Sequence, residues 1–111
     1  MRVKLSGLVH VFQPLQQTDE VVDMPPHCME SHEKVYRMAA TFSTYRRGFH
    51  LIVDPRTDVA TGETILASFE GNIYIGRWWA KHQRRDLIID NSIEPLTGVE
   101  ILGVINQIVG P

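Results

Sequence analysis

The sequence predicts a mainly β fold, a small and partly open β-barrel or sandwich of six to eight short strands. Short runs rich in β-branched and aromatic residues recur along the chain, and glycine or proline bounds most of them. Within several of these runs, apolar residues alternate with small or charged ones, which is the period of a strand. Only the segment Gln13–Glu33 leaves room for a helix of any length.

Three predicted strands form the centre of the chain, within Gly48–Trp79. An Asp-Pro pair ends the first of them, because proline has no amide hydrogen to donate to a neighbouring strand. A tight turn at Glu70–Asn72 joins the second to the third, because its glycine adopts positive φ without steric cost. These three strands are Leu51–Val53, Thr64–Phe69 and Ile73–Trp79.

The flanking segments are shorter or less regular, but four of them alternate enough to predict strands. These are Arg2–Phe12, with a bulge or bend at Ser6-Gly7, and then Lys34–Ala39, Asp86–Asp90 and Val99–Val109. The remaining segments predict connections. They are Gln13–Glu33 (a long connection with at most one short turn of helix), Thr41–Arg47 (a strand end and turn), Lys81–Arg85 (a charged turn) and Asn91–Gly98 (a loop containing Pro95).

Length and composition limit the class of protein. A chain of 111 residues predicts a single domain, 1–111, and its 43% hydrophobic and 22% charged residues are typical of a soluble globular protein. The net charge of -2 argues against nucleic-acid binding as the main task of this chain, since such binding neutralises phosphates. The lone Cys28 excludes an internal disulfide and favours the cytoplasm, and no apolar run reaches membrane-spanning length.

Two of the predicted strands are apolar on both faces. Trp78 and Trp79 must point to opposite faces, with Tyr74 on the face of Trp78. The segment Val99–Val109 likewise carries apolar residues on both faces. Either both strands lie centrally in a closed barrel, or another chain covers part of their surface. The second reading predicts an oligomer interface at Tyr74, Trp78, Trp79, Leu102, Val104 and Ile108.

A series of landmarks runs from Lys34 to the end of the chain: Gly48, Val53-Asp54-Pro55, Gly62-Glu63, Gly71, Arg77-Trp78 and Val99-Glu100-Ile101-Leu102-Gly103-Val104. Their order resembles the carboxy-terminal domain of the LexA-type proteins, which include LexA, UmuD and the CI repressors of temperate phages. Within this family, the chain is most similar to the repressors of non-lambdoid temperate coliphages, of the coliphage 186 type.

The chain departs from this family at the positions that carry its chemistry. Self-cleavage in the family needs a serine nucleophile and a lysine amine kept neutral by desolvation. The family spacing places these two positions on Ala40 and Gly76, and neither residue can supply the missing group. The family commonly cuts an Ala-Gly bond, and this chain has no such pair. The resemblance therefore implies a pseudo-peptidase, with no catalytic residues.

The resemblance also implies a function. The chain would be the dimerisation and higher-order oligomerisation domain of a temperate-phage transcriptional repressor, supporting cooperative operator binding and the maintenance of lysogeny in the bacterial cytoplasm. Its partners would be further copies of itself and an antirepressor protein. Operator DNA would be contacted only through an amino-terminal helix-turn-helix domain that this chain does not contain.

Four alternatives remain open. An active self-cleaving peptidase would use Ser43 as nucleophile and Lys81 as base, although the polar turn around Lys81 keeps an amine charged. A small-ligand sensor would use Tyr45, Arg46 and His50. An adaptor would bind another protein's strand at an open sheet edge. A zinc site at His27, Cys28 and His32, with Glu30 and Glu33 nearby, matches no common ligand spacing, so we expect no metal and no cofactor.

Overall fold

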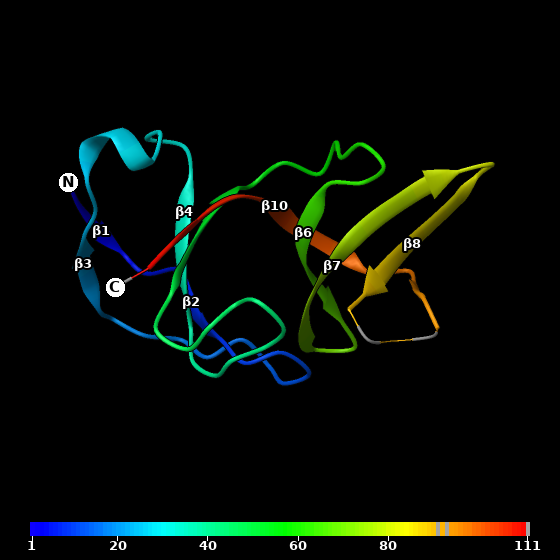
Figure 1. Cartoon of the computed structure of the whole chain (residues 1–111), viewed down its shortest axis with the longest axis horizontal. Coiled ribbons are helices and arrows are strands. Elements are labelled where there is room, and N and C mark those ends of the chain that lie inside the picture. The colour runs from blue at the N-terminus through cyan, green and yellow to red at the C-terminus, as the bar shows by residue number, and fades with distance from the viewer. Residues whose placement is uncertain (91, 93, 111) are drawn as a thin grey trace.

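The computed structural model, which describes residues 1–90, 92 and 94–110, confirms a mainly β fold with 52% strand and 3% helix (Figure 1). Eight strands form one curled sheet in the order β2-β4-β5-β10-β6-β7-β8-β9, and β1 pairs with β3 in a small second sheet. The strands are β1 Arg2–Lys4, β2 Gly7–Val9, β3 Val21–Asp23, β4 Lys34–Met38, β5 His50–Asp54, β6 Thr64–Phe69, β7 Asn72–Lys81, β8 Arg84–Ile89, β9 Leu96–Thr97 and β10 Glu100–Val109, with one 3-10 turn, η1 Pro26–Cys28.

The first predicted strand, Arg2–Phe12, is divided between the two sheets. The amide of Leu5 donates to the Glu20 carbonyl, whereas the next amide, Ser6, donates to the Val35 carbonyl on β4. Two successive residues thus hydrogen-bond in different directions, which ends β1 and begins β2. The bend predicted at Ser6-Gly7 is therefore a change of sheet.

Two predicted loops also contain strands. The segment Gln13–Glu33 includes β3 as well as the short turn η1, because β3 supplies the partner that β1 needs. The predicted loop Asn91–Gly98 includes the two-residue strand β9, which pairs with β8, while residues 91 and 93 lie outside the described residues.

Strands β6 and β7 bury side chains on both faces within a single chain. One face packs into a first core with β2, β4 and β5, through Leu66, Ile73 and Ile75. The other face packs into a second core with β8 and β10, through Ile65 and Trp78. A third core lies between the small sheet and the far face of β4 and β5. The residues that form these cores are Val9, Val11, Tyr36, Met38, Leu51, Val53, Leu66, Ile73 and Ile75 (first), Ile65, Ala67, Trp78, Leu87, Ile89 and Val104 (second), and Leu5, Met24, Met29, Val35 and Ile52 (third).

A short contact brings the two sides of the curled sheet together around the first core. The Phe12 amide donates to the Ile73 carbonyl at 2.9 Å, and the Ile73 amide donates to the Gln13 carbonyl at 2.8 Å. Phe12 has φ of 73°, a conformation that is unfavourable for a bulky residue. Its exposed ring packs edge-to-face against Phe42 and Tyr74, at centroid distances of 5.6 and 5.4 Å. The contact gives the partly open barrel that the sequence predicts.

An ion-pair network fixes the long connection between β5 and β6. Arg56 donates to Asp54 at 3.1 Å and to Glu63 at 2.8 Å, and the other Glu63 oxygen accepts the Ala60 amide at 2.8 Å. The hydrogen bond from Arg56 is the largest influence on Glu63 and lowers the pKa of its carboxyl. The Val-Asp-Pro and Gly-Glu landmarks of the sequence therefore have a structural role at the two ends of this connection.

Gly76 sets the separation between β7 and β8. A Cβ atom at this position would lie 2.5 Å from the Ile88 carbonyl oxygen and 3.0 Å from a Leu87 methyl group. We therefore predict that Gly76→Ala lowers the free energy of unfolding by about 1–3 kcal/mol, as overpacking commonly does. Urea denaturation measures this difference.

Gly110→Ala is the matched control, because a Cβ there meets only the Phe49 ring, at 3.6 Å or more. Its unfolding midpoint should stay close to that of the parent chain. Equal midpoints for Gly76→Ala and the parent chain would contradict the steric role of Gly76.

Candidate functional site

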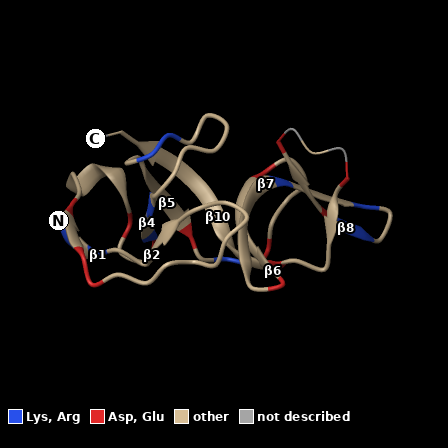
Figure 2. Cartoon of the chain, turned by 90° about the horizontal axis from the view of Figure 1, so that it is seen from below, with Lys and Arg blue, Asp and Glu red and all other residues tan. Residues whose placement is uncertain are grey.

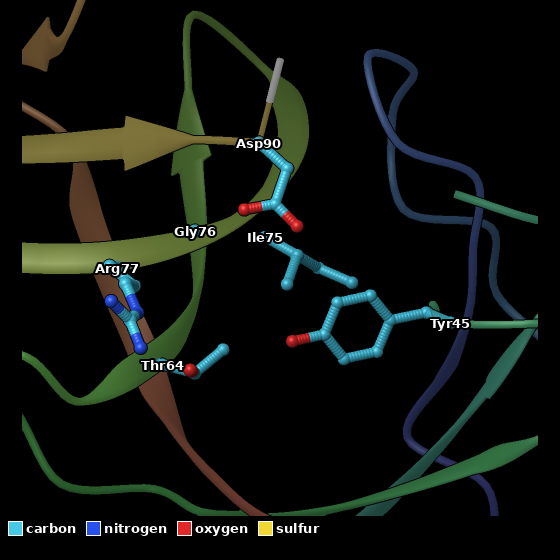
Figure 3. Close-up of a pocket in the computed structure, with 6 residues that line it drawn as sticks. All are labelled: Tyr45, Thr64, Ile75, Gly76, Arg77 and Asp90. Atoms are coloured by element: carbon cyan, nitrogen blue, oxygen red, sulfur yellow. The ribbon is translucent and has the colours of Figure 1, made fainter. Parts of the chain in front are cut away.

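A pocket of about 280 Å³ opens where β7 leaves the first core (Figure 3). Ile73 and Ile75 are buried on one face of β7, but on the same face Arg77 and Trp79 are exposed. This change from buried to exposed side chains occurs because the strands that cover the first core do not extend beyond Ile75. A depression remains in the surface at this point. The residues that line it are Tyr45, Thr64, Ile75, Gly76, Arg77 and Asp90.

Three segments that are distant in sequence place the polar groups of this pocket. Thr64 and Arg77 are direct cross-strand partners on β6 and β7. Asp90 follows the end of β8, and Tyr45 comes from the connection between β4 and β5. A short antiparallel bridge between Phe42 and Tyr45 shapes that connection, and Phe42 anchors it against both neighbouring cores.

Ser43 holds Asp90 in position. Its hydroxyl donates to Oδ2 of Asp90 at 2.7 Å, a contact that joins the β4–β5 connection to the end of β8. Ser43 has φ of 55°, in the left-handed region that non-glycine residues rarely occupy. Backbone conformations of this kind cluster at functional sites. The carboxylate is therefore set in place by the fold.

The Tyr45 hydroxyl points between Thr64 and Arg77 in the pocket (Figure 3). Burial of the ring raises the pKa of the Tyr45 hydroxyl, and the negative charge of Asp90 adds to this effect. A hydrogen bond with Thr64 and the charge of Arg77 act in the opposite direction. The hydroxyl is therefore protonated at neutral pH, and it can both donate and accept a hydrogen bond.

Ala40 and Gly76, the two positions matched to a nucleophile and a base, carry no reactive group in the structure either. Ala40 lies half-buried in the bend that follows β4. Gly76 lies in β7 beside the pocket, and the direction of its missing Cβ leads to the Ile88 carbonyl oxygen on β8. A lysine at this position would require β8 to move, so the close packing of the two strands is incompatible with a side chain there.

Ser43 and Lys81, the alternative nucleophile and base, lie at opposite ends of the β7–β8 hairpin. Ser43 contacts Asp90, next to the strand end where Gly76 pairs with Ile89. Lys81 is five residues further along β7, about 17 Å at the rise of an extended strand. Its amine lies 5.9 Å from the centroid of the Trp79 ring. The structure therefore does not bring these two groups together.

The six residues of the predicted interface do not share one surface. Trp78 and Val104 are only 7% and 4% exposed and pack in the second core, so burial within one chain accounts for both. Tyr74 and Leu102 are half-buried against the cores. Trp79 and Ile108 are 41% and 40% exposed. Trp79 is thus the tryptophan that faces outward.

The three residues proposed for ligand sensing are also separated. Tyr45 lines the pocket, whereas Arg46 is exposed in the β4–β5 connection. His50 begins β5, in the other half of the sheet, and pairs with Arg37 on β4. Only Tyr45 of this group belongs to the candidate site.

The polar residues of the predicted zinc alternative contact other groups. One Glu33 oxygen accepts the Glu30 amide at 2.6 Å, and the other accepts a hydrogen bond from Asn106 at 2.8 Å. His32 Nε2 lies 3.8 Å from Asp54. Within residues 1–90, 92 and 94–110, no three or more histidine, cysteine or acidic side chains gather as a metal site would require.

Comparison with known proteins adds no relative: no family model matches this sequence, and a search of curated proteins finds no match. No described helix is long and apolar enough to cross a membrane.

We predict that the purified chain keeps its full mass during incubation at alkaline pH, where any available lysine amine would be neutral. The Ser43 hydroxyl is engaged by Asp90, and Lys81 lies too far along β7 to remove its proton. Mass spectrometry over a time course measures the result. Fragments that disappear in Ser43→Ala would instead support the peptidase alternative.

The imidazole of His50 leads us to predict that the stability of the fold depends on pH. Its Nε2 is buried with no hydrogen-bond partner, and burial followed by the charge of Arg37 lowers the pKa of its imidazole, against a smaller opposing effect of Glu20. Below about pH 6.5 the unfolded chain therefore binds a proton that the folded chain does not. We expect the free energy of unfolding to fall as the pH drops from about 7 to 5.

Urea denaturation at both pH values measures this effect in the parent chain and in His50→Gln. The variant should lose less stability over this range, because it has no imidazole to protonate. Parallel losses in the two proteins would contradict a titration of His50.

Proposed function

We propose that this chain is the dimerisation and higher-order oligomerisation domain of a temperate-phage transcriptional repressor, with the fold of a LexA-type peptidase and without its reaction. The sequence landmarks from Lys34 onward support the family. The observation that carries the function is a pair of exposed apolar sites in different halves of the sheet, one on the β7–β8 hairpin and one near the C-terminus, in an elongated molecule with extents of 41 × 24 × 22 Å.

The first site lies on the β7–β8 hairpin, which projects from one end of the molecule (Figures 1 and 2). Trp79 and Ile88 are 41% and 43% exposed, and strand pairing places them on the same face of the hairpin. Beside them on this face, the buried Asp86 accepts a hydrogen bond from Thr97 and pairs with Arg84. A rigid platform that carries an exposed tryptophan is typical of a protein–protein contact.

The second site is Ile108 on β10. This part of β10 pairs with β5, in the half of the sheet that contains β2 and β4 and not the β7–β8 hairpin. Two separated sites allow two different contacts between copies, one to form a dimer and another to join dimers. The arrangement favours assembly beyond a dimer more strongly than a single interface would.

Assembly of this kind would make operator binding cooperative. One helix-turn-helix domain contacts one half-site, and joining two of them raises the effective concentration of the second. Each tenfold gain in occupancy needs about 1.4 kcal/mol of coupling. Because Ala40 and Gly76 cannot support self-cleavage, release would require another partner, such as an antirepressor. The proposed location is the cytoplasm of the bacterial host.

We predict that Trp79→Ala weakens self-association at least about tenfold, because a large aromatic anchor commonly contributes about 2 kcal/mol or more to an interface. Ile108→Ser should weaken a separate step, so that the two single variants stop at different assemblies. Sedimentation velocity over a concentration series measures both effects, and circular dichroism checks that the strands are retained.

Val21→Ala is the control for Trp79→Ala, because Val21 is 45% exposed but lies in the small sheet, at the other end of the molecule from the β7–β8 hairpin (Figure 1). This variant should sediment as the parent chain does. A parent chain that remains monomeric at millimolar concentration, or unchanged association in both Trp79→Ala and Ile108→Ser, would contradict the proposal.

A further inference from the structure

We propose that the pocket beside Gly76 binds a free α-amino acid in its zwitterionic form, with the carboxylate on Arg77 and the ammonium group on Asp90. A cation and an anion both line this pocket. Among the ion pairs of the described residues, however, none joins Arg77 to Asp90. Figure 3 shows the two side chains on different sides of the opening, with Ile75 and Gly76 between them. A ligand with two opposite charges would satisfy both.

Arg77 is the group suited to the carboxylate. Four of the other seven arginines pair with carboxylates: Arg2 with Asp23, Arg37 with Glu20, Arg56 with Asp54 and Glu63, and Arg84 with Asp86. Arg77 is held in the middle of β7 by backbone pairing with Thr64 and Ile88 on its two sides. This pairing fixes where the side chain begins, at the edge of the pocket, and the guanidinium at its end presents a planar pair of donors that matches a carboxylate.

Asp90 is the group suited to the ammonium. Ser43 donates to its Oδ2 atom, which orients the carboxylate and leaves Oδ1 for a ligand. An ammonium group requires hydrogen-bond acceptors, and Oδ1 of Asp90 can provide one, whereas the Tyr45 and Thr64 hydroxyls lie toward Arg77 and can donate to the carboxylate (Figure 3). The positions of all three depend on backbone that is already ordered, which lowers the entropic cost of binding.

The size and lining of the pocket restrict the ligand further. A volume of about 280 Å³ is at the small end of ligand sites and holds an amino acid better than a nucleotide. A simple anion would be repelled by Asp90, and a simple amine would be repelled by Arg77. Ile75 provides the apolar contact at the floor, which suits a small aliphatic side chain.

The test is an NMR titration of the full, isotope-labelled chain with L-alanine. Two analogues each lack one charge: N-acetyl-L-alanine has no ammonium, and L-alaninamide has no carboxylate. We expect L-alanine to shift the amide signals of Gly76 and Arg77 with a dissociation constant of about 0.1–10 mM. Both analogues should bind at least about tenfold more weakly, a comparison that does not depend on any variant.

Arg77→Gln and Asp90→Asn should each weaken L-alanine binding at least about tenfold. Arg85→Gln is the matched control, because Arg85 is an exposed arginine of β8 that does not line the pocket, and it should bind as the parent chain does. The proposal is overturned by an absence of shifts up to about 100 mM L-alanine, by equal binding of the analogues, by shifts that lie elsewhere, or by equal losses in Arg77→Gln and Arg85→Gln. Since this site is separate from Trp79 and Ile108, its failure leaves the oligomerisation proposal intact.

Discussion

The structure depends on one constraint: β6 and β7 must bury apolar side chains on both of their faces. Leu66 and Ile75 require a cover on one side, and Ile65 and Trp78 require a cover on the other. No flat sheet can provide both covers from its own strands, so the sheet curls in two places. β2, β4 and β5 fold over one face, whereas β8 and β10 fold over the other. Gly76 belongs to this constraint, because β8 approaches β7 closely enough to exclude any side chain at that position.

The same constraint locates the pocket. The cover over the first core ends near Ile75, and the next residues on this face of β7, Arg77 and Trp79, are exposed. The pocket occupies the boundary between these two regions, and the exposed tryptophan follows immediately beyond it. The proposed ligand site and the proposed contact surface would thus both arise from one strand that is longer than the structure covering it.

Local sequence signals predicted most of the strands. The β-branched run before Asp54 predicted β5, which ends at Asp54 in the structure. The glycine turn before Asn72 predicted the connection between β6 and β7. Pairing between distant segments was harder to predict from the sequence, because β3 and β9 are short and become strands only beside their partners. The candidate site was predicted only at Tyr45 and Gly76. Asp90 and Thr64 carried no signal of their own, since strand order alone brings them to the same depression. Alternation correctly placed Trp78 and Trp79 on opposite faces, but which of them was covered depended on strands elsewhere in the sequence.

The separation of Trp79 from Ile108 has a geometric consequence for any head-to-tail assembly. Each added copy would repeat the same rotation and translation, and the twist of the sheet from β10 through β6 to β7, between the two sites, contributes to that rotation. A rotation that divides a full circle evenly closes the assembly into a ring, and any other rotation with a rise produces an open filament. The number of subunits would then be encoded in the curvature of one sheet, and a bulge added to or removed from β10 would change the stoichiometry without altering either contact.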